Sequence, residues 1–160
     1  MPPLMTWLTN TEAGRLVFTG LVSMLPVVEL RGGIPFGVAL GLRHWDAFLA
    51  AVLGNLVPVP FIMLFARRFL QWLRRFPRLD GFVRRIERKA HLKGRRVRKY
   101  RWFGLCLFVA VPLPGTGAWT GALIAAFLNM RIKSALPSIL LGVLIAGFLI
   151  LGLTYGFTSL

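Results

Sequence analysis

The chain has 160 residues, 56% of them hydrophobic, and its mean hydropathy is +0.69. This composition excludes an ordinary water-soluble domain and is typical of an integral membrane protein with a single domain. The net charge of +15 is concentrated, because 15 of the 20 lysines and arginines lie between Arg67 and Arg101. Basic residues beside apolar segments mark the cytoplasmic side of a membrane protein, so the pattern favours membrane topology over nucleic acid as a partner.

The first predicted element is a helix that begins near Asn10, where Thr9 and Glu12 fit a capping box. Its apolar part is Leu16–Val28. At 1.5 Å per residue this part covers roughly 20 Å, which is too short for a hydrocarbon core of about 30 Å. The first helix is therefore not predicted to cross the membrane by itself.

The stretch Glu29–Pro35 follows, and it places an acid, a base, two glycines and a proline inside an apolar run. Charged residues at membrane depth usually face a cavity or a partner, and glycines with a proline favour a break in the helix. The apolar residues Phe36–Leu42 add only about two more turns. Two half-length helices around a break predict a re-entrant hairpin, with a single kinked span as the alternative.

Ala47–Phe65 is a run of 19 residues without a formal charge, and it is long enough to span a membrane. Arg67 and Arg68 follow it, so this end is predicted to be cytoplasmic. Pro58 and Pro60 predict a kink in the span. Asn55 is interpreted in one of two ways: it bonds a neighbouring helix, or it faces the site.

The basic segment predicts an amphipathic helix from Leu79 to Tyr100, because its apolar residues recur at close to helical spacing. Such a helix would lie on the cytoplasmic leaflet and bind anionic lipid headgroups. A soluble basic loop is the alternative.

The second half repeats the order of the first. Trp102–Val111 is a short apolar segment, Pro112–Gly121 is a second predicted break that carries no charge, and Ala122–Met130 is helix-like again. Ala135–Phe157 is a second full span. A shift of 88 positions also superposes Pro26 on Pro114, Gly33 on Gly121 and Arg43 on Arg131.

These elements predict one all-α membrane domain with a first repeat at about 10–66, a basic connector at about 67–101 and a second repeat at about 102–160. If the connector is cytoplasmic, the two hairpins open toward opposite sides. The result is an inverted repeat of the kind found in secondary transporters, with both termini on the outer side of the cell membrane.

The residues of the two breaks resemble a known family. Glu-Leu-Arg-Gly-Gly-Ile-Pro at Glu29–Pro35, Pro-Leu-Pro-Gly-Thr-Gly at Pro112–Gly117 and the continuation Trp119–Gly121 are similar to the small multidrug export protein family. That family is regarded as a relative of the DedA/VTT superfamily of membrane proteins. The resemblance implies two opposed re-entrant hairpins, and for DedA relatives the movement of phospholipid or polyprenyl phosphate across the bilayer. The second break departs from DedA proteins, which typically carry arginines there.

The candidate mechanism depends on the two charges of the first break. Arg31 suits a phosphate bidentately, and Glu29 would act as the protonation switch that couples transport to protons. The alternative is that the two side chains only neutralise each other or bond free backbone groups at the hairpin tip. Because positions i and i+2 point apart on a helix, a joint role predicts locally unwound backbone. The predicted substrate-binding residues are Glu29, Arg31, Gly32, Gly33, Pro35, Asn55, Pro112, Pro114, Gly115, Thr116, Gly117 and Trp119.

Catalysis is not expected, because no nucleophile, base or metal-ligand pattern stands out, and no cofactor or metal is predicted. Three function hypotheses follow. The chain is a carrier for an anionic lipid such as polyprenyl (undecaprenyl) phosphate, a proton-coupled exporter of small amphipathic compounds, or a membrane scaffold that does not transport. We expect membrane lipids as partners, no nucleic acid, and a homodimer, since one chain offers few helices around a pathway.

Overall fold

The computed structural model describes residues 3–73, 100–113 and 115–158, and every regular element in these ranges is an α-helix. The prediction of an all-helical chain is therefore confirmed for the described residues. The predicted amphipathic helix of the basic connector falls almost wholly on residues 74–99, which lie outside the described ranges.

The N-terminal part contains three short helices: α1 (Pro3–Asn10), α2 (Glu12–Ser23) and α3 (Glu29–Ala39). The predicted capping box was wrong. Thr9 lies inside α1, and the side chain of Thr11 caps α2 by accepting the Gly14 N–H at 3.0 Å. Thr11 is two residues closer to Gly14 than Thr9 and has the extended backbone that an N-cap requires.

The first break also lies elsewhere than predicted. The chain leaves helix α2 after Ser23 and enters α3 at Glu29, so the turn covers residues 24–28 and the charged stretch starts a helix. The glycines of this stretch allow close packing: a Cβ on Gly33 would overlap the Ser23 hydroxyl. Phe18 and Phe36 meet edge to face with ring centroids 5.3 Å apart, so α2 and α3 fold back on each other as a helical hairpin.

Two segments are long and apolar enough to cross a membrane, as predicted for Ala47–Phe65 and Ala135–Phe157. The first is His44–Phe69, formed by α4 (His44–Leu56) and α5 (Pro58–Leu73). The two helices meet at Val57 because Pro58 lacks the N–H that would continue the ladder of α4. The second is Ile132–Gly156, within α9 (Ile132–Thr158).

A second helical hairpin precedes α9. It consists of α7 (Arg101–Ala110) and α8 (Ala118–Phe127), and the connecting turn covers residues 111–117. The predicted break was too long, because Trp119 and Gly121 already belong to α8. Gly121 packs so closely on α7 that a Cβ there would lie 2.6 Å from Val109 Cγ2.

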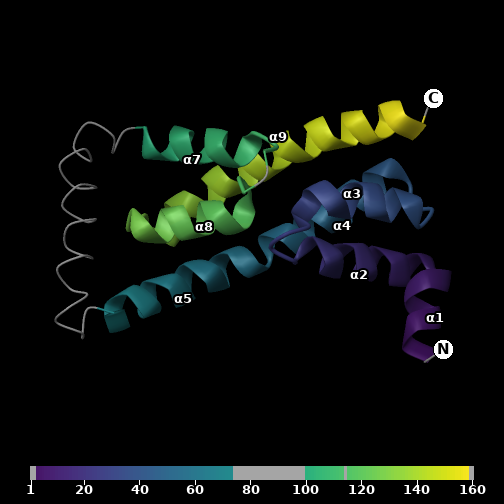
Figure 1. Ribbon diagram of the computed structural model, residues 1–160, viewed down its shortest axis with the longest axis horizontal. Coiled ribbons are helices and arrows are strands. Elements are labelled where there is room, and N and C mark those ends of the chain that lie inside the picture. The colour runs from purple at the N-terminus through teal and green to yellow at the C-terminus, as the bar shows by residue number, and fades with distance from the viewer. Residues whose placement is uncertain (1–2, 74–99, 114, 159–160) are drawn as a thin grey trace.

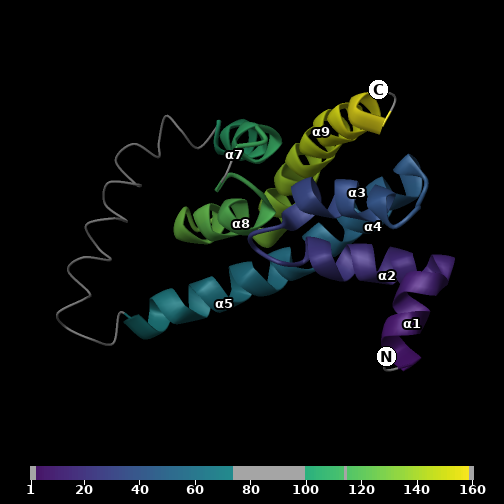
Figure 2. The same ribbon diagram turned by 45° about the vertical axis from the view of Figure 1, so that its right-hand side comes forward.

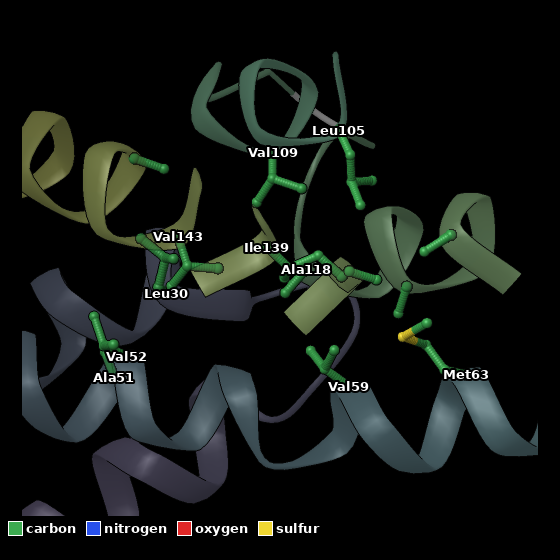
Figure 3. Packing of buried hydrophobic residues seen from close by; sticks show 14 of the residues in the cluster. Leu30, Ala51, Val52, Val59, Met63, Leu105, Val109, Ala118, Ile139 and Val143 are labelled. Atoms are coloured by element: carbon green, nitrogen blue, oxygen red, sulfur yellow. The ribbon is translucent and has the colours of Figure 1, made fainter. Parts of the chain in front are cut away.

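The two hairpins point toward each other. In Figures 1 and 2 both termini lie at one end of the molecule, while the end of α5 and the start of α7 lie at the other. The α2–α3 hairpin packs on α4, α7 packs on α9, and α8 packs on α5. Figure 3 shows the apolar core that joins them, with Leu30, Val59, Val109, Ala118 and Ile139 pointing into the same space.

The two halves share a turn geometry at positions 88 residues apart. Helices α3 and α8 end at Ala39 and Phe127, and α4 and α9 begin at His44 and Ile132. In the first turn the Leu42 N–H donates to the Gly37 carbonyl at 3.1 Å. In the second the Met130 N–H donates to the Ala125 carbonyl at 2.9 Å. Gly41 and Asn129 occupy the left-handed position, with φ of 87° and 51°.

The contact between α2 and α4 gives a stability prediction. A Cβ on Gly54 would overlap the Gly20 carbonyl, so Gly54→Ala forces the two helices apart and is expected to lower the free energy of unfolding by about 1–3 kcal/mol. Gly152→Ala is the control, because nothing lies within 4 Å of its Cβ position. Thermal unfolding in detergent measures both variants, and equal melting temperatures for the two would contradict the close packing.

Candidate functional site

The candidate site is the place where the turns of the two hairpins meet, which we call the tip contact: residues 24–31 of the first hairpin and 111–119 of the second. The Trp119 indole N–H donates to the Met24 carbonyl at 3.0 Å. The backbone N–H of Trp119 donates to Glu29 Oε1 at 3.3 Å. Arg31 of the first hairpin donates hydrogen bonds to Leu113 and Thr116 of the second turn. Residues far apart in the sequence therefore form one polar cluster.

Glu29 lies at the start of helix α8. It is the first residue of its own helix, is only 7% exposed, and its φ of 49° is left-handed, which is strained for a residue with a side chain. Its carboxylate accepts the N–H of the second residue of α8, so it supplies a negative charge where the helix dipole is positive. Gly117 makes room for this carboxylate, because a Cβ at Gly117 would overlap both oxygens.

Arg31 binds the backbone of the second turn. Its guanidinium donates to the carbonyl of Leu113, to the carbonyl of Val111 at 3.5 Å and to the hydroxyl oxygen of Thr116 at 3.0 Å. The Thr116 hydroxyl itself lies 2.6 Å from the Val111 carbonyl oxygen and accepts the Leu113 N–H at 3.2 Å. Arg31 and Thr116 together bind backbone groups that no helix satisfies.

The structure corrects the expected arrangement of the two charges. The backbone from Glu29 to Ala39 is helical, so Glu29 and Arg31 are not brought together by unwound backbone. No ion pair joins them in the described part of the chain. Each side chain instead contacts the opposite hairpin. Their separation on the helix lets one charge contact the start of α8 and the other contact the preceding turn.

The other predicted residues are spread over three places. Gly32, Gly33 and Pro35 lie in α3, while Pro112, Gly115 and Gly117 lie in or beside the second turn. Pro114 is outside the described residues. Asn55 is fully buried in α4, and its amide makes no hydrogen bond with the residues described here.

Sequence reasoning allowed for bonds to free backbone groups at the tip but did not identify which carbonyls accept them. The carbonyls of Met24, Val111 and Leu113 receive side-chain donors across the tip contact. A signal was present, because the prolines at 112 and 114 prevent a helix over these residues and so leave carbonyls free.

Two grooves start at the tip contact. The first lies between α3 and α9, has a volume of about 460 Å³, and is lined by Arg31, Pro35, Val38, Ala39, Ile150, Leu153 and Thr154. The second lies between α5 and α8, has a volume of about 570 Å³, and is lined by Pro58, Phe61, Ile62, Phe65, Ala66, Phe69, Trp119, Leu123 and Phe127. The first groove carries one charged side chain, and the second carries none.

The described residues contain no group of three histidine, cysteine or carboxylate side chains that could hold a metal ion. The chemistry of the site is therefore that of one carboxylate, one guanidinium and backbone dipoles, which can bind and release a ligand or a proton.

Comparison with known families gives one match. The model of the small multi-drug export protein family matches residues 29–149, which include the motifs Glu29–Pro35 and Pro112–Gly117, α4, α5 and most of α9. Searches of curated proteins and of solved structures gave no match.

The contact between Gly117 and Glu29 can be tested by a double-mutant cycle. Gly117 has extended backbone, which any residue adopts, so Gly117→Ala is expected to act through its overlap with the carboxylate alone. We expect it to lower the free energy of unfolding by about 1–3 kcal/mol in the wild type, and by much less in the Glu29→Ala background. Denaturant unfolding in detergent measures the cycle, and additive effects would refute the contact.

Proposed function

The chain belongs to the small multi-drug export protein family, and from this premise we propose that it is a membrane transporter for an amphiphile with an anionic phosphate head and an apolar tail. Polyprenyl (undecaprenyl) phosphate is the leading candidate. The observation that carries this proposal is the position of Arg31 at the tip end of the apolar groove between α3 and α9.

Arg31 suits the head of such a substrate. A guanidinium has five N–H donors, and Arg31 uses three of them at the tip contact, which leaves two for a phosphate oxygen. A buried arginine attracts an anion and repels a cation. The groove beyond it is lined by Pro35, Val38, Ala39, Ile150 and Leu153, which suit an apolar chain.

The arrangement of the hairpins supports an inverted repeat with re-entrant hairpins. Each of their helices has 10 to 12 residues, about half of what a hydrocarbon core needs. The packing of α2 on α4 corresponds to that of α7 on α9, and the packing of α3 on α9 corresponds to that of α8 on α5.

The grooves correspond as well. Arg31, Pro35 and Ala39 of the first groove precede Trp119, Leu123 and Phe127 of the second by 88 positions. In the same way, Ile150, Leu153 and Thr154 follow Ile62, Phe65 and Ala66 by 88 positions. Related grooves that open from one central contact suit alternating access from the two sides of a membrane.

In this scheme the tip contact is the gate, and Glu29 is its proton-sensitive part. A protonated Glu29 would lose the negative charge that stabilises it at the start of α8. The two hairpins could then separate at the tips. The basic end of the molecule, at the end of α5 and the start of α7, is proposed to be cytoplasmic. Both termini then lie on the outer side of the cell membrane.

The lipid hypothesis is tested by a flip assay with polyprenyl phosphate in liposomes. Arg31→Ala is expected to lower the rate about 10-fold to 100-fold, because a charged hydrogen-bond donor contributes about 1.5–3 kcal/mol. Arg43→Ala is the matched control, since Arg43 is exposed and lies at the base of the same hairpin.

A further variant separates phosphate binding by Arg31 from the stability of the tip contact. Thr116→Val removes a tip hydrogen bond but keeps the guanidinium, so it is expected to lower flipping less than Arg31→Ala does. If Arg31→Ala moves the lipid at the wild-type rate, the proposed role of Arg31 is wrong.

A second candidate function, export of small aromatic cations, is favoured by the groove between α5 and α8. Its rings include Phe61, Phe65, Phe69, Phe127 and Trp119, and no charged residue lines it. Aromatic faces attract cations, and a volume of about 570 Å³ is in the range of small-molecule sites. The family name agrees with this function equally well.

The exporter hypothesis is tested by efflux of ethidium from cells that express the protein. Phe65→Ala is expected to reduce efflux several-fold through loss of a ring from the groove. Phe103→Ala is the matched control, because Phe103 is similarly exposed, at 65% against 75%, but lies on α7 away from the groove. If neither ethidium nor lipid is moved, the scaffold hypothesis replaces both.

A further inference from the structure

A third cavity lies at the base of the second hairpin, at the opposite end of α7 and α8 from the tip contact. Its volume is about 410 Å³, and it is lined by Arg101, Trp102, Asn129, Met130, Arg131 and Ser134. These residues come from the start of α7, the turn after α8 and the first turn of α9. Neither proposed transport groove includes any of them.

The cavity carries positive charge, and no carboxylate lies among the described residues that line it. The sequence contains no acidic residue after Glu87, although Arg101, Arg131 and Lys133 follow it. The described acidic residues, Glu12, Glu29 and Asp46, belong to α2, α3 and α4. The arginines of the cavity therefore have no carboxylate on the elements that form it.

Arg101 is held at the cavity by a contact with the backbone, and Arg131 lies exposed at its edge. Arg101 donates from Nη1 to the Leu128 carbonyl at 3.1 Å, and its Nε–H is buried without a hydrogen bond to any described residue. The Arg131 side chain is exposed beside the first turn of α9. Two guanidinium groups at one polar cavity suit a phosphate group.

The corresponding place in the first half carries a carboxylate that the cavity in the second half lacks. Arg131 lies 88 positions after Arg43, and both precede the first residue of a long helix. Ser134 lies 88 positions after Asp46, so a hydroxyl stands in the second half where the first half has a carboxylate. The first half supplies its own anion beside its arginine, and the second half does not.

We infer that this cavity binds the phosphate of an anionic phospholipid. The lipid source is favoured over free phosphate by Trp102 at the cavity and by the exposed Phe103 next to it, because aromatic rings lie at the headgroup level of membranes. Basic pockets between membrane helices bind such headgroups. The bound lipid would join the base of α7 to the start of α9 and so hold the second hairpin in place.

Native mass spectrometry of the purified full chain tests this site with phosphatidylglycerol and phosphatidylcholine of the same acyl chains. The wild type is expected to prefer phosphatidylglycerol. Arg131→Gln should weaken that preference about fivefold, since one basic residue near an anionic surface contributes about 1 kcal/mol. Arg43→Gln, its counterpart in the first half, should leave the preference unchanged.

Ser134→Asp is the sharpest variant, because it restores the missing carboxylate without removing an arginine. An aspartate in the first turn of a helix is also favourable, so the variant is expected to fold. It should abolish the preference for phosphatidylglycerol, whereas the neutral Ser134→Asn should keep it.

The opposite results would overturn the inference. They are a Ser134→Asp variant that still prefers phosphatidylglycerol, or an Arg43→Gln variant that loses as much preference as Arg131→Gln. Displacement of phosphatidylglycerol by millimolar inorganic phosphate would assign the cavity to free phosphate instead of lipid. Because these variants leave Arg31 and both transport grooves unchanged, failure here leaves the proposed function intact.

Discussion

The crosswise bonding of the two hairpin tips is the interaction on which the rest of the arrangement depends. A helix end that is buried away from water leaves backbone N–H and C=O groups without partners, and each such group costs several kcal/mol. Here the first hairpin supplies a carboxylate to the start of α8, and Arg31 supplies donors to the carbonyls of the turn before it. In the opposite direction, the Trp119 indole N–H of the second hairpin donates to the Met24 carbonyl of the first turn. Each tip therefore provides hydrogen-bond partners for backbone groups of the other tip.

This arrangement explains why only the first of the two hairpin tips carries charged side chains. Glu29 and Arg31 lie two positions apart on α3, yet they bind two different groups of the opposite hairpin. The second turn needs no charge of its own, because the first hairpin brings both. The same contact places Arg31 at one groove and Trp119 at the other, so a separation of the tips would change both grooves together.

The sequence predicted the order of elements better than their boundaries. Apolar run length identified both long spans and the short helices that precede each. The breaks were misplaced, because glycine was interpreted as a helix breaker where Gly33 and Gly121 instead allow helices to pack closely. Only the neighbouring helix distinguishes these two uses of glycine. The Thr11 cap was missed because Thr9 has a glutamate three residues later and Thr11 has Gly14 there, so the capping-box pattern favoured Thr9.

The sequence by itself determined the all-helical class, the two spans and the residues that carry charge at the tips, because length, hydropathy and charge are local properties. The tertiary structure decided what those charges contact. Glu29 and Arg31 were expected to act on each other, on a ligand or on free backbone groups at the hairpin tip, and the structure shows contacts with residues more than 80 positions away. Such contacts depend on how two hairpins pack, which no local pattern encodes. The grooves and the basic cavity arise from the same packing.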